Sequence, residues 1–200
     1  MKNIAVFASG NGSNFQAIVN AVKKGKLKAN LKLLVCDNPK AYVLERANKA
    51  GISVFLIERQ NYAGKKEFED AIIGRLKAEK IGLIVLAGFM RILSAGFVRQ
   101  FKSKILNVHP SLLPSFKGAH AIKDAFNYGV KVAGVTVHLV DEKVDHGPII
   151  LQEPVRVSQR DTLKSLEKKI HKEEHRIYPE AIRLFVSGRL KIEGRNVRVE

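Results

Sequence analysis

Residues 4–15 read IAVFASGNGSNF, a short apolar run followed at once by a loop rich in glycine. Five consecutive apolar residues are typical of a strand that is buried on both faces of a sheet. Phe15, Ile18, Val19 and Val22 then recur at helical spacing. A strand, a glycine turn and a helix in this order predict the first unit of an α/β fold with a parallel sheet.

The same alternation of strand and helix continues through the first half of the chain, and it implies helices on both faces of the sheet. In the second half, Pro154 interrupts a predicted strand and places it near an edge, because proline cannot donate to a neighbouring strand. A long helix is predicted over residues 162–187, with Pro179 either kinking it or starting a new segment. The predicted strands lie at residues 4–8, 31–36, 54–57, 81–87, 105–108, 132–140 and 149–157.

The whole chain, residues 1–200, is predicted to be one domain with a Rossmann-like, twisted and mostly parallel sheet of about seven strands. A content of 46% hydrophobic and 27% charged residues is ordinary for a soluble domain. Residues 189–200 are expected to form a polar hairpin or tail.

Composition argues against several classes of protein. The longest apolar run, residues 81–90, is too short to span a bilayer, and because residue 4 already opens a predicted strand, no signal peptide is expected. The single cysteine, Cys36, excludes an internal disulfide and a cysteine-rich metal site, and no spacing of histidines and carboxylates favours a metal ion. We therefore expect a protein of the reducing cytoplasm that binds neither membrane nor metal.

The formal net charge of +16 suits nucleic acid, an anionic small substrate or solubility alone. The lysines are spread along the chain, no arginine-rich tract with interleaved aromatic residues is present, and tryptophan is absent. Nucleic acid is therefore not an expected partner, and a basic surface that attracts anionic substrates is favoured.

The glycine loop, residues 9–14, is a candidate phosphate site. Glycines let the backbone approach a ligand, and the free N–H groups at the start of the following helix favour an anion. The side chains of Ser13 and Asn14 can add donors. Phe15 stands where the dinucleotide-binding fingerprint has its third glycine, so the loop is not that motif. A plain tight turn is the alternative that the loop alone leaves open.

Residues 107–114, NVHPSLLP, carry the strongest indication of catalysis. Asn107 and His109 are two residues apart, so at the end of a strand their side chains point to the same side. Pro110 and Pro114 stiffen the loop beside them. An amide N–H and an imidazolium can both donate to an oxygen that gains charge, so the pair indicates acyl or formyl transfer. A lone histidine after a strand is more often structural, and the companion Asn107 favours catalysis.

Three further features have both a structural and a functional interpretation. Asp145 lies between two predicted strands and is either a turn residue or a carboxylate that orients His109. Glu174 falls on the apolar face of the long helix, where a carboxylate needs a partner, either a ligand amine, Arg176 or a lysine. Residues 87–93, AGFMRIL, end the fourth strand, where ligands usually bind in such folds, and form either a ligand loop or a buried turn.

These motifs together resemble the phosphoribosylglycinamide formyltransferase family, the folate-dependent enzymes of purine synthesis. The likeness runs from about residue 2 to residue 192 and implies the formyltransferase fold. The loop around His109 and Asp145 is shared with other formyltetrahydrofolate enzymes, whereas the glycine loop points to this family. The motifs that carry the resemblance lie at residues 9–14, 86–93, 107–114, 134–145 and 174–179.

The resemblance implies a role for each motif. Asn107, His109 and Asp145 are expected to be catalytic, and Glu174 is expected to meet the amine of the substrate. The phosphate of that substrate is expected at Gly12, Ser13 and Asn14. The folate is expected at Lys65, Met90, Arg91, Ile92, Leu93, Asn107, Val140, Asp141 and Asp145. His146 departs from the family, in which many members have a small residue at this place.

The resemblance further implies that 10-formyltetrahydrofolate, as co-substrate, formylates the amine of glycinamide ribonucleotide, in a monomer or homodimer. Residues 1–100 would be roughly the phosphate-binding half, and residues 101–188 the folate-binding and catalytic half. Two alternatives share the His109 loop. A methionyl-tRNA formyltransferase is expected to carry a further basic C-terminal domain, and a formyltetrahydrofolate hydrolase a further N-terminal regulatory domain. A nucleotide-sensing binding protein would need the glycine loop but not the three catalytic residues together.

Overall fold

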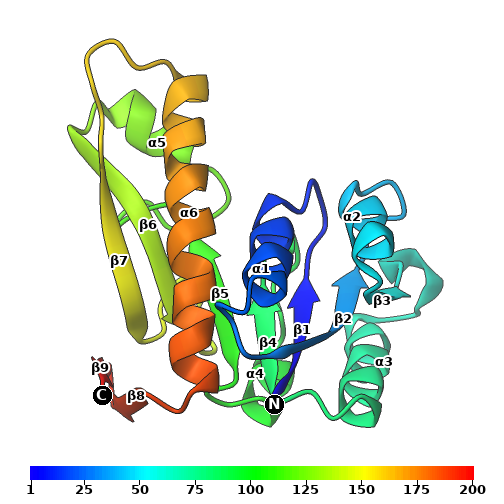
Figure 1. Ribbon diagram of the computed structural model, residues 1–200. Helices are drawn as coiled ribbons and strands as arrows, with labels where there is room; N and C mark the ends of the chain where they lie inside the picture. Colours follow the sequence, from blue (N-terminus) through cyan, green and yellow to red (C-terminus); the bar gives the residue numbers. More distant parts are fainter.

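Seven strands form one sheet in the computed structural model, which describes residues 1–200 (Figure 1). The strands are β1 (Asn3–Phe7), β2 (Asn30–Cys36), β3 (Ser53–Leu56), β4 (Leu83–Leu86), β5 (Ile105–His109), β6 (Val132–Leu139) and β7 (Ile149–Arg156). Their order across the sheet is β3-β2-β1-β4-β5-β6-β7. The first five strands pair in parallel, whereas β6 runs antiparallel to both of its neighbours, β5 and β7. The predicted mostly parallel sheet is confirmed.

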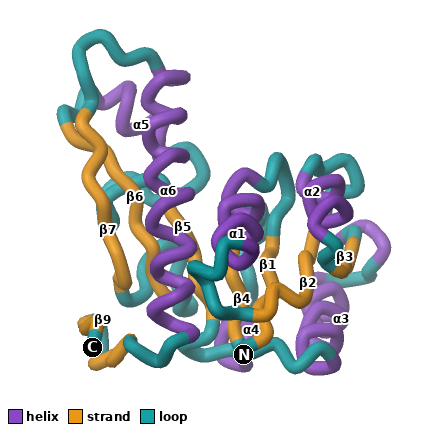
Figure 2. Tube along the Cα trace, viewed as in Figure 1, coloured by secondary structure: helices purple, strands orange, loops and turns teal.

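Helices cover both faces of this sheet, as predicted (Figures 1 and 2). They are α1 (Ser13–Lys23), α2 (Val43–Ala50), α3 (Lys65–Ala78), α4 (Ala95–Gln100), α5 (Ala121–Tyr128) and α6 (Leu163–Val186), with a short 3-10 turn, η1 (Arg59–Asn61). Side chains alternate between the two faces along a strand. Ile4 and Val6 of β1 therefore belong to the larger core cluster with α1, α2 and α6, whereas Ala5 and Phe7 belong to a smaller cluster with α3 and α4.

All seven predicted strands are present, and their ends differ from the prediction by at most two residues. The largest difference concerns residues 81–87, of which only Leu83–Leu86 form a strand. Ile81 instead donates to the carbonyl of Leu76 and closes the end of α3. β7 lies at the edge of the sheet, in agreement with Pro154.

The helices bring one correction, and short helical elements such as α4 and η1 were not predicted. α6 continues through Pro179 as a single helix, so the predicted alternative of a new segment there is wrong. Tyr178 and Ala181, on either side of the proline, are fully buried and hold this turn against the core despite the missing N–H. α4 was not predicted, because its six residues are too few to show a helical period. It is instead started by Ser94, whose side chain accepts a hydrogen bond from the amide of Phe97.

The C-terminal residues form a hairpin of β8 (Leu190–Glu193) and β9 (Asn196–Val199), one of the two predicted alternatives. The hairpin lies apart from the main sheet, beside the turn that joins β6 and β7 (Figure 1). Leu190 and Val197 pack against the larger core cluster. No helix combines the length and the apolar character that crossing a membrane requires.

Candidate active site

β5 ends at the two polar residues that the sequence singles out. Leu106 and Val108 point into the larger core cluster, so Asn107 and His109 share the opposite face of the strand, as predicted. His109 is only 4% exposed, whereas Asn107 is half-buried. The strand thus presents an imidazole and a more accessible carboxamide on one side.

Both ring nitrogens of His109 have partners. Nε2 lies 2.8 Å from the carbonyl oxygen of Phe116, and Nδ1 lies 3.4 Å from Oδ2 of Asp145. A carbonyl oxygen can only accept, so Nε2 carries a hydrogen, and Nδ1 is the nitrogen that can exchange a proton. The structure therefore brings Asp145 to His109 across a separation of 36 residues in the chain, as the functional interpretation of Asp145 requires.

Asp145 reaches His109 from a strained backbone position. Its φ is 47°, in the left-handed region that residues other than glycine rarely adopt. Its carboxylate accepts a hydrogen bond of 2.9 Å from the amide of Gly118 and lies 3.9 Å from Nε2 of His138. Such strain persists only where surrounding contacts hold the residue, and it is common at functional sites.

His138 completes the site, although its sequence position indicated only a place on a strand. The register of the sheet sets it opposite Asn107, and Nδ2 of Asn107 lies 3.2 Å from Nε2 of His138. Nδ1 of His138 lies 2.7 Å from the carbonyl oxygen of Leu139, so Nδ1 donates and Nε2 accepts from the carboxamide. Burial lowers the pKa of His138 and favours this neutral form. Asn107 is thereby oriented with a second amide hydrogen available for an oxygen.

The glycine loop turns into α1 at Gly12, whose φ is 75°. A Cβ at this position would lie 2.5 Å from Cγ2 of Val43, so only glycine fits. The turn leaves the first amides of α1, which include those of Ser13 and Asn14, without helical partners and available to an anion. The backbone geometry that the predicted phosphate site needs is present.

Glu174 of α6 lies beside this loop and is only 4% exposed. Its Oε2 lies 2.9 Å from Nδ2 of Asn14 and 3.0 Å from Nδ1 of His171. Arg176 pairs with two other glutamates, so it is not the partner that the sequence left open for Glu174. The hydrogen bond to Glu174 raises the pKa of His171. Both contacts use Oε2, which leaves Oε1 for a ligand.

The loop after β4 is tied to the glycine loop through Ser9. The hydroxyl of Ser9 accepts from the amide of Met90 at 2.9 Å and donates to Oδ1 of Asp37 at 2.5 Å. The other oxygen of Asp37 lies 2.5 Å from Nε of Arg91. On this anchored loop Met90 and Ile92 are 73% and 68% exposed, which is unusual for two large apolar side chains so close in sequence. An apolar ring bound here would cover them.

Comparisons with known proteins agree with this geometry. The sequence pattern of the formyl transferase family matches residues 2–182. The chain is 50% identical to phosphoribosylglycinamide formyltransferase of Bacillus subtilis, over 92% of this chain and 94% of the relative. The crystal structure of glycinamide ribonucleotide transformylase 1 from Symbiobacterium toebii superimposes with a TM-score of 0.97 at 46% identity, over 100% of this chain and 94% of the other. The chain belongs to the phosphoribosylglycinamide formyltransferase family.

Relatives of lower sequence identity also support this family membership. The phosphoribosylglycinamide formyltransferase of Escherichia coli is 38% identical over 95% of this chain and 90% of the relative. The family and the formyltransferase fold that the motifs implied are therefore confirmed. The roles of single residues stay predictions.

The remaining residues that the phosphoribosylglycinamide formyltransferase resemblance implied lie around the same region. Leu93 and Val140 pack against the smaller core cluster. Lys65, the first residue of α3, has its Nζ 3.9 Å from Oε1 of the buried Glu69. That carboxylate accepts a 2.8 Å hydrogen bond from the amide of Ser94, so Lys65 borders the loop of residues 90–93. No group of three or more histidine, cysteine, aspartate or glutamate side chains is arranged to hold a metal ion.

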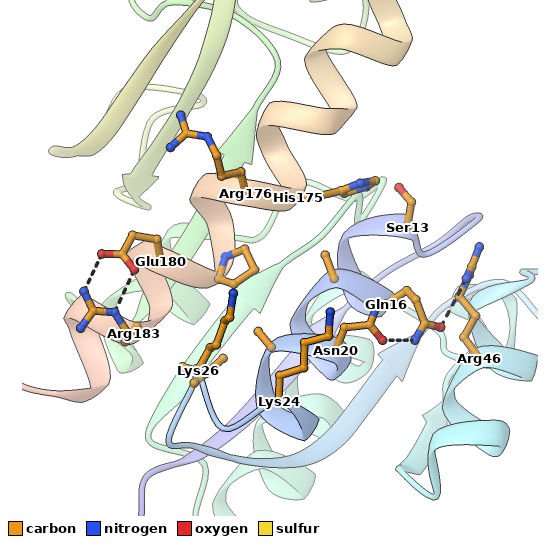
Figure 3. A pocket seen from close by; sticks show the side chains of 14 residues that line it. Ser13, Gln16, Asn20, Lys24, Lys26, Arg46, His175, Arg176, Glu180 and Arg183 are labelled. Carbon is orange, nitrogen blue, oxygen red and sulfur yellow. Dashed lines mark hydrogen bonds and ion pairs between the residues drawn. The ribbon is translucent and has the colours of Figure 1, made fainter.

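A groove of about 830 Å³ runs along α1 and α6 and contains none of the three predicted catalytic residues (Figure 3). It begins at Ser13, beside the glycine loop. Arg183 pairs with Glu180 there, whereas Lys24 and Lys26 form no ion pair. The charged residues that line the groove are Lys24, Lys26, Arg46, Arg176, Glu180 and Arg183. In this phosphoribosylglycinamide formyltransferase family member the groove thus places several basic side chains next to the predicted phosphate site.

Proposed function

We propose that this protein transfers the formyl group of 10-formyltetrahydrofolate to the amine of glycinamide ribonucleotide, a step of de novo purine synthesis. The observation that carries the proposal is the convergence of Asn107, His109 and Asp145 beside two different ligand loops. β1, β4 and β5 are parallel neighbours in the sheet, so the loops that follow their carboxyl ends lie close together. The names of the relatives support the same substrates.

The two loops suit two different molecules. The free amides after Gly12, with Ser13 and Asn14, suit the phosphate of the ribonucleotide. Oε1 of Glu174 suits its amine, which accounts for a carboxylate on an apolar helix face. The exposed pair Met90 and Ile92 suits the flat heterocycle of a folate. Arg91, Leu93, Lys65 and the segment 140–145 would line the rest of that pocket.

In the proposed reaction the neutral amine attacks the formyl carbon, a carbon–nitrogen bond forms, and the formyl oxygen becomes negatively charged. The carboxamide of Asn107 and an N–H at Nδ1 of His109 donate to that oxygen. The bond between the formyl carbon and N10 of the folate then breaks. The proton of the amine moves to N10 through His109 or through a water held by Asp145. Placing both substrates side by side contributes up to about 7–11 kcal/mol in favourable systems.

The test of this function is formyl transfer from 10-formyltetrahydrofolate to three acceptors, namely glycinamide ribonucleotide, charged initiator tRNA and water. We expect transfer to glycinamide ribonucleotide alone, and loss of that transfer in His109→Ala. Transfer only to tRNA, or hydrolysis without an acceptor, would replace this function with one of the two related formyl-group activities. No turnover with any acceptor, but tight binding of a nucleotide, would indicate a binding protein.

We also propose that the enzyme acts in the cytoplasm as a monomer or homodimer and needs no resident metal. The buried, unpaired Cys36 suits a reducing compartment. Turnover that is unchanged after treatment with a chelator is the expected result, and activity restored only by an added divalent cation would contradict it.

A further inference from the structure

The C-terminal hairpin contacts the residue that follows Asp145. Arg195, in the turn between β8 and β9, donates through one guanidinium nitrogen to the carbonyl oxygen of His146 at 2.9 Å. A second nitrogen of Arg195 lies 3.3 Å from Nε2 and 3.5 Å from Nδ1 of the same imidazole. Two residues 49 positions apart in the chain are thus joined at the backbone next to Asp145.

His146 is held from its other side by Asp141, the second residue of the turn between β6 and β7. Nδ1 of His146 lies 2.6 Å from Oδ2 of Asp141. Although partial burial opposes it, this hydrogen bond holds the pKa of Asp141 below its ordinary value. Because Nδ1 donates to the carboxylate, Nε2 of a neutral ring can accept from Arg195. Asp141, His146 and Arg195 therefore form one continuous polar contact from the turn to the hairpin.

Asp145 is followed directly by two residues that are held in place. The first is His146, and the second is Gly147, where a Cβ would lie 1.9 Å from the carbonyl oxygen of Leu139. Gly147 is therefore packed against the backbone of β6 with no room for a side chain. The left-handed φ of 47° at Asp145 is uncommon outside glycine, although aspartate adopts it more readily than most residues, and the contacts of its neighbours help to hold it.

The hairpin that carries Arg195 is anchored to the rest of the protein. Leu190 and Val197, one from each of its strands, pack against the larger core cluster. Its open end is closed by the amide of Glu200, which donates to the carbonyl of Arg189 at 2.9 Å. Figures 1 and 2 show the hairpin beside the turn between β6 and β7, outside the sheet that carries the other site residues.

We propose that Arg195 is a positioning residue: through His146, the C-terminal hairpin holds Asp145 in the conformation that sets its carboxylate beside His109. The effect on turnover rests on the proposed function, in which Asp145 serves catalysis, whereas the effect on the order of the turn rests on geometry alone. The inference also gives a role to His146.

The test compares Arg195→Ala with the wild-type chain in two measurements. Hydrogen exchange of the amides of residues 141–147 is expected to become about tenfold faster, because local opening is no longer opposed by the contact. Turnover of glycinamide ribonucleotide is expected to fall about tenfold in kcat with an unchanged KM for that substrate, because a small misplacement of a catalytic group is costly. Arg195→Lys should recover part of both effects, since an ammonium can still donate to the carbonyl of His146.

Arg198→Ala is the matched control, because Arg198 lies on the same hairpin and pairs only within it, with Glu193 at 3.8 Å. It should leave exchange and turnover unchanged. Exchange of the turn that is equal in Arg195→Ala and wild type would overturn the proposal, and so would faster exchange with unchanged kcat. Equal losses in both variants would point to hairpin stability instead and would also overturn it. A wild-type chain without formyl transfer would refute the proposed function, and the exchange measurement would still decide the role of Arg195 in ordering the turn.

Discussion

At the scale of single residues, backbone carbonyl groups set the direction of the hydrogen bonds that His138 and His109 make. Leu139 fixes the donor nitrogen of His138, His138 accepts from Asn107, and Asn107 keeps one amide hydrogen for an oxygen. In the same way Phe116 fixes the proton on Nε2 of His109 and leaves Nδ1 to face Asp145. The proposed catalytic groups are therefore held in defined orientations.

Replacing Asn107 by alanine should remove one of the two donors to the developing oxyanion. We expect kcat to fall by about 10²- to 10³-fold, which corresponds to roughly 3–4 kcal/mol of lost transition-state stabilisation. Asn107→Asp keeps the shape but offers an acceptor in place of the donor, so it should be at least as damaging. Steady-state kinetics, with thermal melting to verify the fold, measure this effect. Near-normal turnover of either variant would remove Asn107 from the mechanism.

His138 predicts a dependence of stability on pH. Burial lowers its pKa below the ordinary value of 6.5, so on acidification the unfolded chain takes up a proton before the folded one does. The contribution of His138 to stability is therefore complete above pH 6.5 and is lost as the pH falls below it. Urea unfolding at about pH 7.5 and about pH 5.5 should give a smaller difference for His138→Gln than for the wild type. Burial also lowers the pKa of His175, which leaves a residual slope. An equal slope in both proteins would contradict the prediction.

At the scale of elements, the short helix α4 fixes one end of the predicted folate loop. Ser94 caps α4 through Phe97 and is itself held by the buried Glu69, which accepts from both its amide and its hydroxyl. Lys65 flanks the same carboxylate. The geometry of residues 90–93 thus depends on a helix cap and on a residue of α3 that the sequence did not indicate.

Ser94→Ala should affect stability and ligand binding together. Loss of the cap should lower the free energy of unfolding by about 1 kcal/mol. Freeing the loop should raise the KM of the formyl donor about fivefold with little change in kcat. Thr162→Ala is the matched control, because Thr162 also caps a helix, α6, through the amide of Ser165, and the residues of that cap are not among the predicted site residues. It should destabilise by a similar amount without changing this KM, and an equal rise in KM in both variants would show that general loosening is the cause.

The elements also show what a sequence can predict. Apolar runs such as residues 4–8 predicted the strands because burial on both faces requires an unbroken apolar run. The partners of the polar residues depend on contacts between distant segments, such as Asn14 with Glu174, which are 160 residues apart. His138 lies opposite Asn107 because of the register between β6 and β5. The alternation of residues within β6 does not determine that register. The contact of Glu174 with His171 was also missed, although their spacing of three residues on one helix would have allowed its prediction.

At the scale of the whole molecule, the sheet brings the loops of both proposed substrates together at the carboxyl ends of β1, β4 and β5, in a chain whose formal net charge is +16. The positive charge is spread along the sequence, yet part of it gathers in the groove that leads to the glycine loop (Figure 3). Arg46 there already bonds to the carbonyl of Asn11 in that loop. Lys24 and Lys26 have no acidic partner, so their field is available to an approaching anion.

This arrangement predicts that the position of the charge matters more than its total. Lys24→Glu with Lys26→Glu, and Lys102→Glu with Lys104→Glu at the opposite end of β5, each lower the formal charge from +16 to +12, because every change removes two charges. At low salt the groove pair should lower kcat/KM for glycinamide ribonucleotide about three- to tenfold, and the distant pair much less. The difference should shrink above about 0.1 M salt, where the screening length is about 10 Å. At saturating substrate kcat should match the wild type, because neither pair touches the reacting atoms. Equal losses in the two double variants would show that net charge, and not the groove, attracts the substrate.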